Sequence, residues 1–142
     1  PDAARADAPC LTFTTSGTTS GPKLVLHNQR SIATHACDVA PVIGTDKPGS
    51  SVLAVVPLCG TFGLALALSG VAGGARVITM QQFDGAKAGE LIRAHGVTHT
   101  AGGDDMLGRI AEAAQGRPFD SLVFSAYATF TPTAAEHSIL PR

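Results

Sequence analysis

Residues 14–23 combine hydroxyl-bearing side chains and glycines with a closing lysine, in the order Thr-Thr-Ser-Gly-Thr-Thr-Ser-Gly-Pro-Lys. Glycines let the backbone approach an anion closely and turn its N–H groups toward it. Hydroxyl groups can donate hydrogen bonds to phosphate oxygens, and a lysine supplies a point charge. The run therefore predicts a loop that binds a polyphosphate. The candidate binding residues are Thr15, Ser16, Gly17, Thr18, Thr19, Ser20, Gly21 and Lys23.

The run differs from the Walker phosphate loop, which places four residues between its glycines and ends in Gly-Lys-Ser/Thr. Here three residues separate Gly17 from Gly21, and Pro22 and Leu24 flank Lys23. The alternative interpretation is a solvated Ser/Thr/Gly turn between two strands, without a ligand. The Pro-Lys pair at this register favours phosphate binding over that alternative.

The run resembles the phosphate loop of the AMP-forming, or adenylate-forming, synthetases, whose signature is Thr-Ser-Gly-Thr-Thr-Gly-x-Pro-Lys-Gly. Ser20-Gly21 stands in place of Gly-x and Leu24 in place of the last glycine, so the loop keeps its length. The likeness extends in order and spacing from Leu11 to about residue 135. The identical positions are Thr15, Ser16, Gly17, Thr18, Thr19, Pro22 and Lys23.

The resemblance implies ATP-dependent activation of a small-molecule carboxylic acid, with ATP and Mg²⁺ as cofactors and CoA as the usual acceptor. The acid would attack the α-phosphate and give acyl-AMP and pyrophosphate, while the loop orients and neutralises the outer phosphates. These ligases run to several hundred residues in two domains, whereas this chain has 142. We expect residues 1–142 to be one partial AMP-binding domain without the small C-terminal domain, lacking the remainder of its parent chain. It would hold no catalytic residue and be inactive alone.

The candidate substrate pocket comes from three segments that match the family less closely, namely residues 57–63, 102–103 and 125–130. Residues 57–63 resemble a Pro-hydrophobic-aromatic-His-x-x-Gly segment bordering the acyl or aryl group, with Cys59 and Gly60 replacing the aromatic residue and the histidine. The smaller pair predicts room for a bulkier or differently shaped carboxylate. The alternative is a turn whose glycines serve only the backbone. The candidate pocket residues are Cys59, Gly60, Thr61, Gly102, Gly103, Tyr127 and Ala128.

Two carboxylates follow the second of these segments, at Asp104 and Asp105. Such a pair of carboxylates could bind a metal ion or act in acid–base catalysis. The structural interpretation, which we favour, makes one of them a helix N-cap and places the other in the first helical turn. The five histidines show no metal-ligand spacing, and no metal ligand is predicted.

The composition restricts the class of protein. Apolar residues make up 44% of the chain and charged residues 15%, which suits a folded domain with a buried core. A net charge of -1 gives no support for nucleic acid or an anionic membrane surface as partner. No apolar run reaches the length of a membrane span. The odd set of cysteines, Cys10, Cys37 and Cys59, predicts reduced and mostly buried thiols in a cytoplasmic protein.

Hydrophobic runs and breakers alternate along the chain. Strands are expected at residues 11–15, 24–27, 52–56, 76–80, 97–100 and 122–126. Helices are expected from Asn28 to 43, at 62–71, from a cap at Asp84 to 95, from Asp104 or Asp105 to 114, and from Pro132 onward. This alternation predicts an α/β fold of β-α-β units, with a largely parallel sheet flanked by helices. Such sheets bind ligands at the carboxyl ends of their strands. The alternatives left open are a nucleotide-binding module without chemistry and an unrelated α/β domain with a structural loop.

Overall fold

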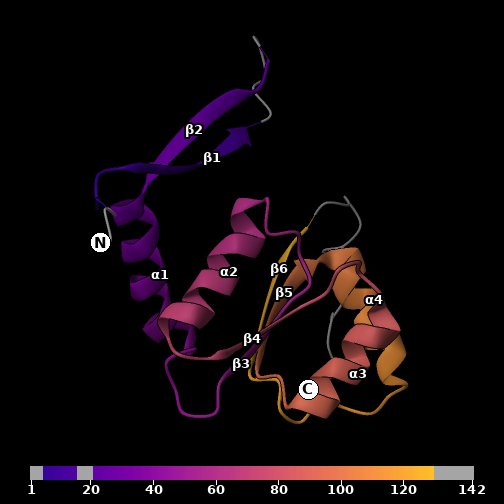
Figure 1. The fold of residues 1–142 in the computed structure, drawn as a ribbon. Helices are drawn as coiled ribbons and strands as arrows, with labels where there is room; N and C mark the ends of the chain where they lie inside the picture. Colours follow the sequence, from indigo (N-terminus) through magenta and orange to yellow (C-terminus); the bar gives the residue numbers. More distant parts are fainter. Residues whose placement is uncertain (1–4, 16–20, 130–142) are drawn as a thin grey trace.

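The computed structural model of the chain describes residues 5–15 and 21–129. These residues form a hairpin and a separate parallel sheet, with helices between and around them (Figure 1). The hairpin pairs β1 (Pro9–Thr15) with β2 (Lys23–Asn28) in antiparallel fashion. The second sheet holds four parallel strands in the order β4-β3-β5-β6. The predicted α/β class with a largely parallel sheet is confirmed.

The parallel sheet has two central strands, β3 (Ser51–Ala54) and β5 (His99–Gly103), and every residue of both is buried. The edge strands are β4 (Arg76–Thr79) and β6 (Phe124–Ala128), which are more exposed. A parallel strand covered on both faces needs no polar side. This is why the run around Val52 and Leu53 shows no alternation of polar and apolar residues.

Helices lie on both sides of this sheet (Figure 1). On one side α2 (Thr61–Ala72) packs on the strands, and α1 (Gln29–Ile43) packs on α2. On the other side lie α3 (Gly85–His95) and α4 (Asp104–Ala114). Successive strand residues point to opposite faces. Val52 therefore packs with Leu66 of α2, whereas its neighbour Leu53 joins the cluster formed with α3 and α4.

The helix ends follow the local signals. Asn28 caps α1 by accepting a hydrogen bond from the Ser31 N–H at 2.8 Å, and Gly44 ends it with a φ of 85°. Asp84 caps α3 by accepting from the Lys87 N–H at 2.7 Å. Side-chain oxygens at these positions satisfy N–H groups that have no partner within the helix. The predicted caps and stops of these two helices are confirmed.

Several predicted boundaries are wrong. β3 ends at Ala54, two residues before the end of its apolar run, and β6 spans Phe124–Ala128 rather than residues 122–126. The Leu122 N–H bonds to the Phe119 carbonyl in a turn, so β6 begins only where pairing with β5 starts. The expected helix from Pro132 lies outside the described residues.

The predicted burial of the cysteines is also wrong, because all three are free and exposed. Cys10 lies in the hairpin, whose strands are largely exposed. Cys37 follows the buried Ala36 and lies on the solvent side of α1. Cys59 lies in the turn before α2. Composition alone cannot place a cysteine on the inner or outer face of its element.

Candidate functional site

The hairpin presents the ends of the candidate phosphate loop. Thr15 pairs directly with Lys23, and both are exposed where the loop leaves and rejoins the hairpin. Ser16, Gly17, Thr18, Thr19 and Ser20 lie outside the described residues. Gly21 has a φ of 87°, in the left-handed region that favours glycine. Gly21 occupies the position directly after the one where the signature has its second glycine.

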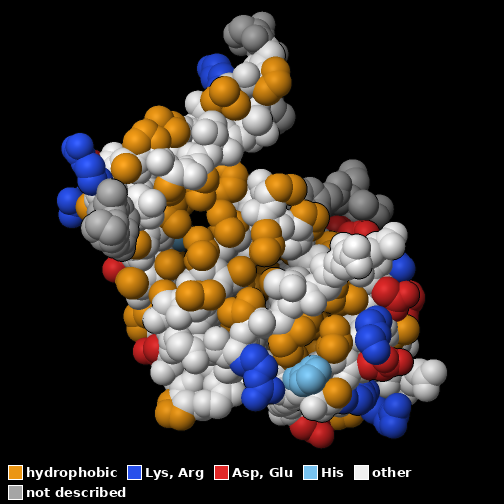
Figure 2. Space-filling model, viewed as in Figure 1, with side chains coloured by type: hydrophobic (Ala, Val, Ile, Leu, Met, Phe, Trp, Pro, Cys, Tyr) orange, Lys and Arg blue, Asp and Glu red, His pale blue; other side chains and the backbone are white. Residues whose placement is uncertain are grey.

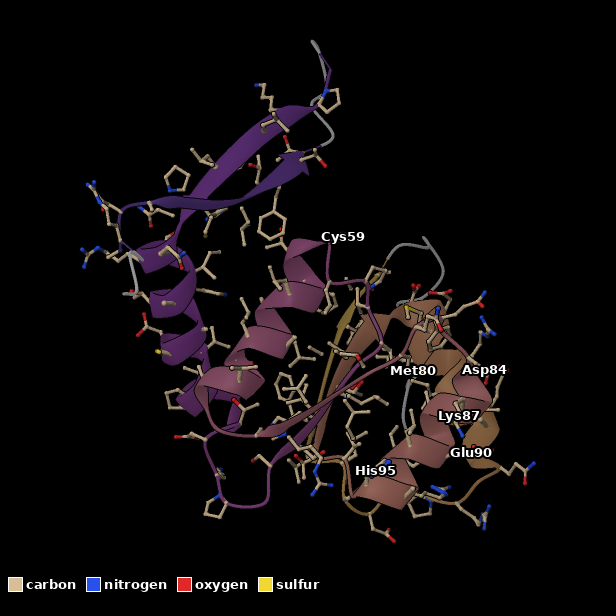
Figure 3. All side chains as sticks on the ribbon, viewed as in Figure 1. Cys59, Met80, Asp84, Lys87, Glu90 and His95 are labelled. Atoms are coloured by element: carbon tan, nitrogen blue, oxygen red, sulfur yellow. The ribbon has the colours of Figure 1, made fainter. Side chains whose placement is uncertain are left out.

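Electrostatically, the mouth of this loop suits an anion. Among the described residues no carboxylate pairs with Lys23; their two ion pairs are Arg5–Asp7 and Lys87–Glu90. In the latter pair, the hydrogen bond from Lys87 to Glu90 raises the pKa of the lysine. This second pair lies on the exposed side of α3, away from the hairpin (Figure 3).

The carboxyl edge of the parallel sheet brings four of the predicted pocket residues together. Gly102 pairs with Tyr127 and Gly103 with Ala128 at the ends of β5 and β6. The segment from Cys59 to Thr61 follows the neighbouring strand β3 and leads into α2. Figure 3 places Cys59 at the end of α2 nearest the hairpin. Tyr127 and Ala128 both lie in β6, beyond the end at residue 126 that the sequence predicted for this strand, and the tyrosine is 57% exposed.

Two glycines at the start of α2 differ in the space around their backbones. Gly60 is the N-cap, with a φ of -101° and a ψ of 151°, which any residue adopts. A Cβ added there would lie 3.7 Å from the Pro57 carbonyl oxygen, an ordinary contact. At Gly63 the same added atom would lie 2.6 Å from that oxygen. Space for a side chain therefore exists at Gly60 and not at Gly63.

The glycines at the end of β5 are placed on opposite faces of the sheet. A Cβ added to Gly102 would lie 3.1 Å from Cδ2 of Leu107, so this glycine allows α4 to pack closely on the strand. By alternation Gly103 faces the side of α2. Gly103 is also the N-cap of α4, with a φ of -68° and a ψ of 158°.

The prediction that Asp104 or Asp105 caps this helix is wrong, because both lie in its first turn. Carboxylates in that position are favourable for the helix dipole. Asp104 is buried and has an interaction partner. Within the described residues no group of three or more His, Cys, Asp and Glu side chains could hold a metal ion. Both carboxylates therefore lie where they favour the N-terminus of α4.

Sequence reasoning missed two hollows near these residues. One, of about 300 Å³, lies between the hairpin, α1 and α2, and both His27 and His35 line it. The other, of about 530 Å³, lies beyond the carboxyl ends of β3 and β4 and is lined in part by Met80 and Met106. A signal for the first was present in α2, where Thr61, Leu64, Ala65 and Leu68 follow the i, i+3, i+4, i+7 spacing of one helix face.

The comparison with protein families gives one match, to the AMP-binding enzymes, over residues 1–136. A curated relative, 4-coumarate–CoA ligase 5 of Oryza sativa subsp. japonica, is 33% identical over 99 residues. That alignment covers 65% of this chain and 18% of the ligase. The chain thus spans less than a fifth of that relative's length.

Solved structures of similar fold include the o-succinylbenzoate CoA synthetase of Bacillus subtilis in complex with its acyl-adenylate intermediate. The TM-score is 0.77 at 27% identity, over 91% of this chain and 33% of that one. The same synthetase in complex with ATP and a magnesium ion gives a TM-score of 0.75 at 27% identity, over 87% and 26% of the two chains. In the part of the chain that the structure describes, no helix is long and apolar enough to cross a membrane.

Proposed function

Because the chain belongs to the family of AMP-binding enzymes, we propose that it is part of a ligase that activates a carboxylic acid with ATP. The acid oxygen attacks the α-phosphorus, the bond from that phosphorus to the β-phosphate bridging oxygen breaks, and acyl-AMP and pyrophosphate result. CoA then accepts the acyl group as a thioester and releases AMP. In this proposal residues 1–142 are one partial AMP-binding domain, and the remaining machinery lies elsewhere in the parent chain. The family match removes the alternative of an unrelated α/β domain.

The observation that carries the proposal is the hairpin with its loop sequence. The exposed Lys23 opposite Thr15, and the left-handed Gly21, form a mouth that suits the outer phosphates of ATP. The hydroxyls and N–H groups of residues 15–21 would hold these phosphates, and Lys23 would neutralise charge as pyrophosphate leaves. Mg²⁺ bound to the nucleotide would supply further charge neutralisation. The similar synthetase in complex with ATP and a magnesium ion supports this choice of cofactors.

The acid would lie at the carboxyl edge of the parallel sheet. There Gly103 and Ala128 are paired neighbours, and the turn from Cys59 to Thr61 follows the adjacent strand. Parallel sheets place their ligands at this edge because strand ends and helix N-termini converge on it. We further propose a cytoplasmic location, which three unpaired cysteines support.

The test is carboxylate-dependent exchange of pyrophosphate into ATP by the full-length parent protein, with straight-chain, branched and aromatic acids. Exchange with at least one acid is the expected result. Nucleotide binding with magnesium, without exchange for any acid, would instead favour a nucleotide-binding module without chemistry. Absence of both would contradict the proposal.

A further inference from the structure

The proposed reaction needs two parts of the molecule in a fixed relation. The outer phosphates of ATP would lie at the hairpin, whereas the acid would lie at the carboxyl edge of the parallel sheet. The hairpin is bonded to α1 at its base, and a hollow of about 300 Å³ lies between the hairpin, α1 and α2. Figure 2 shows the surface hollowed beneath the hairpin. The position of the phosphate loop relative to the sheet therefore depends on how α1 is held.

The far end of α1 is joined to the sheet by a buried histidine. His99, the first residue of β5, is 1% exposed, and its Nε2 lies 2.8 Å from the carbonyl oxygen of Ile43, the last residue of α1. The last carbonyls of a helix have no partner within it. Pro41 weakens this turn further, because it has no N–H to donate to the Cys37 carbonyl. The imidazole thus supplies a hydrogen bond that the helix cannot make for itself.

The hydrogen bonds around His99 determine which ring nitrogen carries the hydrogen. A carbonyl only accepts, so Nε2 carries it, and Nδ1 of the neutral ring accepts. The Thr98 hydroxyl lies 2.6 Å from Nδ1 and 3.0 Å from the Ser51 carbonyl, with one hydrogen to donate. That carbonyl already accepts from the Thr98 N–H at 2.9 Å, so the hydroxyl donates to Nδ1. The ring is thereby held between the start of the sheet and the end of α1.

We propose that His99 is a positioning residue of the ligase, which fixes α1 and the attached hairpin relative to the edge of the sheet. The inference rests on the proposed function, which assigns the phosphates to the hairpin and the acid to that edge. Gly103 is four residues further along β5, and at about 3.3 Å per residue about 13 Å separates it from His99. His99 therefore acts through α1 and not by contact with a substrate.

The consequence is a loss of rate without a loss of binding. Without the bond to Ile43, the phosphate loop and the turn that borders the acid each keep their own residues. Their relative position is then less well defined, and a misplacement of about 1 Å can lower a rate about a hundredfold. A variant without this bond should therefore have a lower kcat, with the KM values for ATP and for the acid nearly unchanged.

The experiment compares two amides at position 99 of the full-length parent in the pyrophosphate exchange reaction. In His99→Gln the amide nitrogen is as many bonds from Cα as Nε2 is, so it can still donate to Ile43. In His99→Asn it is one bond closer and cannot reach. His99→Asn should lower kcat about ten- to a hundredfold, and His99→Gln should restore most of it. Leu53→Ala, which destabilises the other face of the sheet, is the control, and its kcat per folded molecule should not fall.

A distance measurement reports the positioning directly. Nitroxide labels can be attached to Cys10 in the hairpin and Cys59 before α2, which are both exposed, once the other cysteines of the parent are replaced. The distribution of distances between the two labels should broaden or shift in His99→Asn and return in His99→Gln.

An unchanged kcat or an unchanged distance distribution in His99→Asn would overturn the inference and leave the proposed function standing. A loss of kcat in Leu53→Ala as large as in His99→Asn would do the same, because stability alone would then explain it. If no acid supports exchange, the proposed function fails, and the label distances still decide whether His99 fixes the hairpin. If His99→Asn does not fold, Thr98→Val should show the same loss, and Thr98→Ser, which keeps the hydroxyl, should not.

Discussion

β2 and β3 are both short strands rich in apolar residues, yet they occupy opposite environments. In β3 Leu53 is 0% exposed between two layers of helices, whereas in β2 Leu24 is 73% and Leu26 is 64% exposed. The hairpin is attached mainly at its base, where the Gln29 N–H bonds to the Ala8 carbonyl and the Arg30 N–H to the Ala6 carbonyl. We infer that the two regions have different roles. The buried parallel sheet stabilises the fold, whereas the hairpin positions the candidate phosphate loop.

Truncating one leucine in each strand tests most directly whether the two strands contribute differently to stability. Leu53→Ala should cost about 2–5 kcal/mol of unfolding free energy, because it removes buried methyl groups and leaves a cavity. Leu24→Ala should change it by less than about 0.5 kcal/mol, since that side chain is largely in water. Urea unfolding of both variants measures the difference. Similar losses would mean that the hairpin contributes to the core.

The next expected effect is on function and not on stability. In the full-length parent, Lys23→Ala should lower kcat/KM for ATP about ten- to a hundredfold, as for a lost charge-assisted contact of about 1.5–3 kcal/mol. The melting temperature should stay unchanged, because Lys23 is exposed. Lys47→Ala, in the exposed turn after α1, removes an equal charge and serves as control. Unchanged kinetics in Lys23→Ala would exclude the assigned role.

Gly60, the N-cap of α2, and Gly63, in its first turn, extend the comparison to the edge of the sheet. Gly63→Ala should destabilise the protein by about 1–3 kcal/mol, because the new methyl group meets backbone oxygens that cannot withdraw. Gly60→Ser should be neutral or stabilising by a few tenths of a kcal/mol, since serine is a favourable N-cap. Thermal melts of the pair test this. A loss at Gly60 equal to that at Gly63 would contradict the geometry.

Substrate preference should respond to the same turn. Gly60→His in the full-length parent should shift the ratio of kcat/KM for small over large acids by about tenfold, a typical effect of pocket volume. The KM for ATP should remain nearly constant, because the proposed phosphate loop belongs to the hairpin and not to this turn. Measurements across acids of graded size, with a melt beside them, decide this. Uniform loss for all acids with a lower melting temperature would refute the pocket assignment.

The smallest expected effect concerns the junction between hairpin and α1. Asn28→Ala removes the side-chain acceptor of the Ser31 N–H and should cost about 1 kcal/mol. Hydrogen exchange in β2 should quicken more than exchange in β3. Asp84→Ala removes the equivalent cap of α3 and should leave exchange in β2 unaltered. Equal acceleration in both strands would argue that the hairpin and the sheet open as one unit.

The elements whose ends depend on local chemistry were predictable. Asn28 and Asp84 cap helices because their side chains reach N–H groups three residues on, within the same segment. The alternation of strands and helices predicted the parallel sheet for a similar reason. The boundaries of β3 and β6 were not predictable, because a strand ends where its partner strand ends, and that partner is distant in the sequence.

The candidate site was likewise predictable only in part. By itself, the sequence predicted a phosphate loop that ends in Lys23, indicated the family, and named Gly103 and Ala128 as candidate pocket residues. Only the tertiary structure decided that Gly60 has space for a side chain while Gly63 has none, that Cys59 is exposed, and that a hollow lies where the hairpin meets α1 and α2. A glycine or an alanine has the same letter whether it faces a backbone oxygen, solvent or a void. That distinction is made by elements far apart in the chain, and it exists only after they pack.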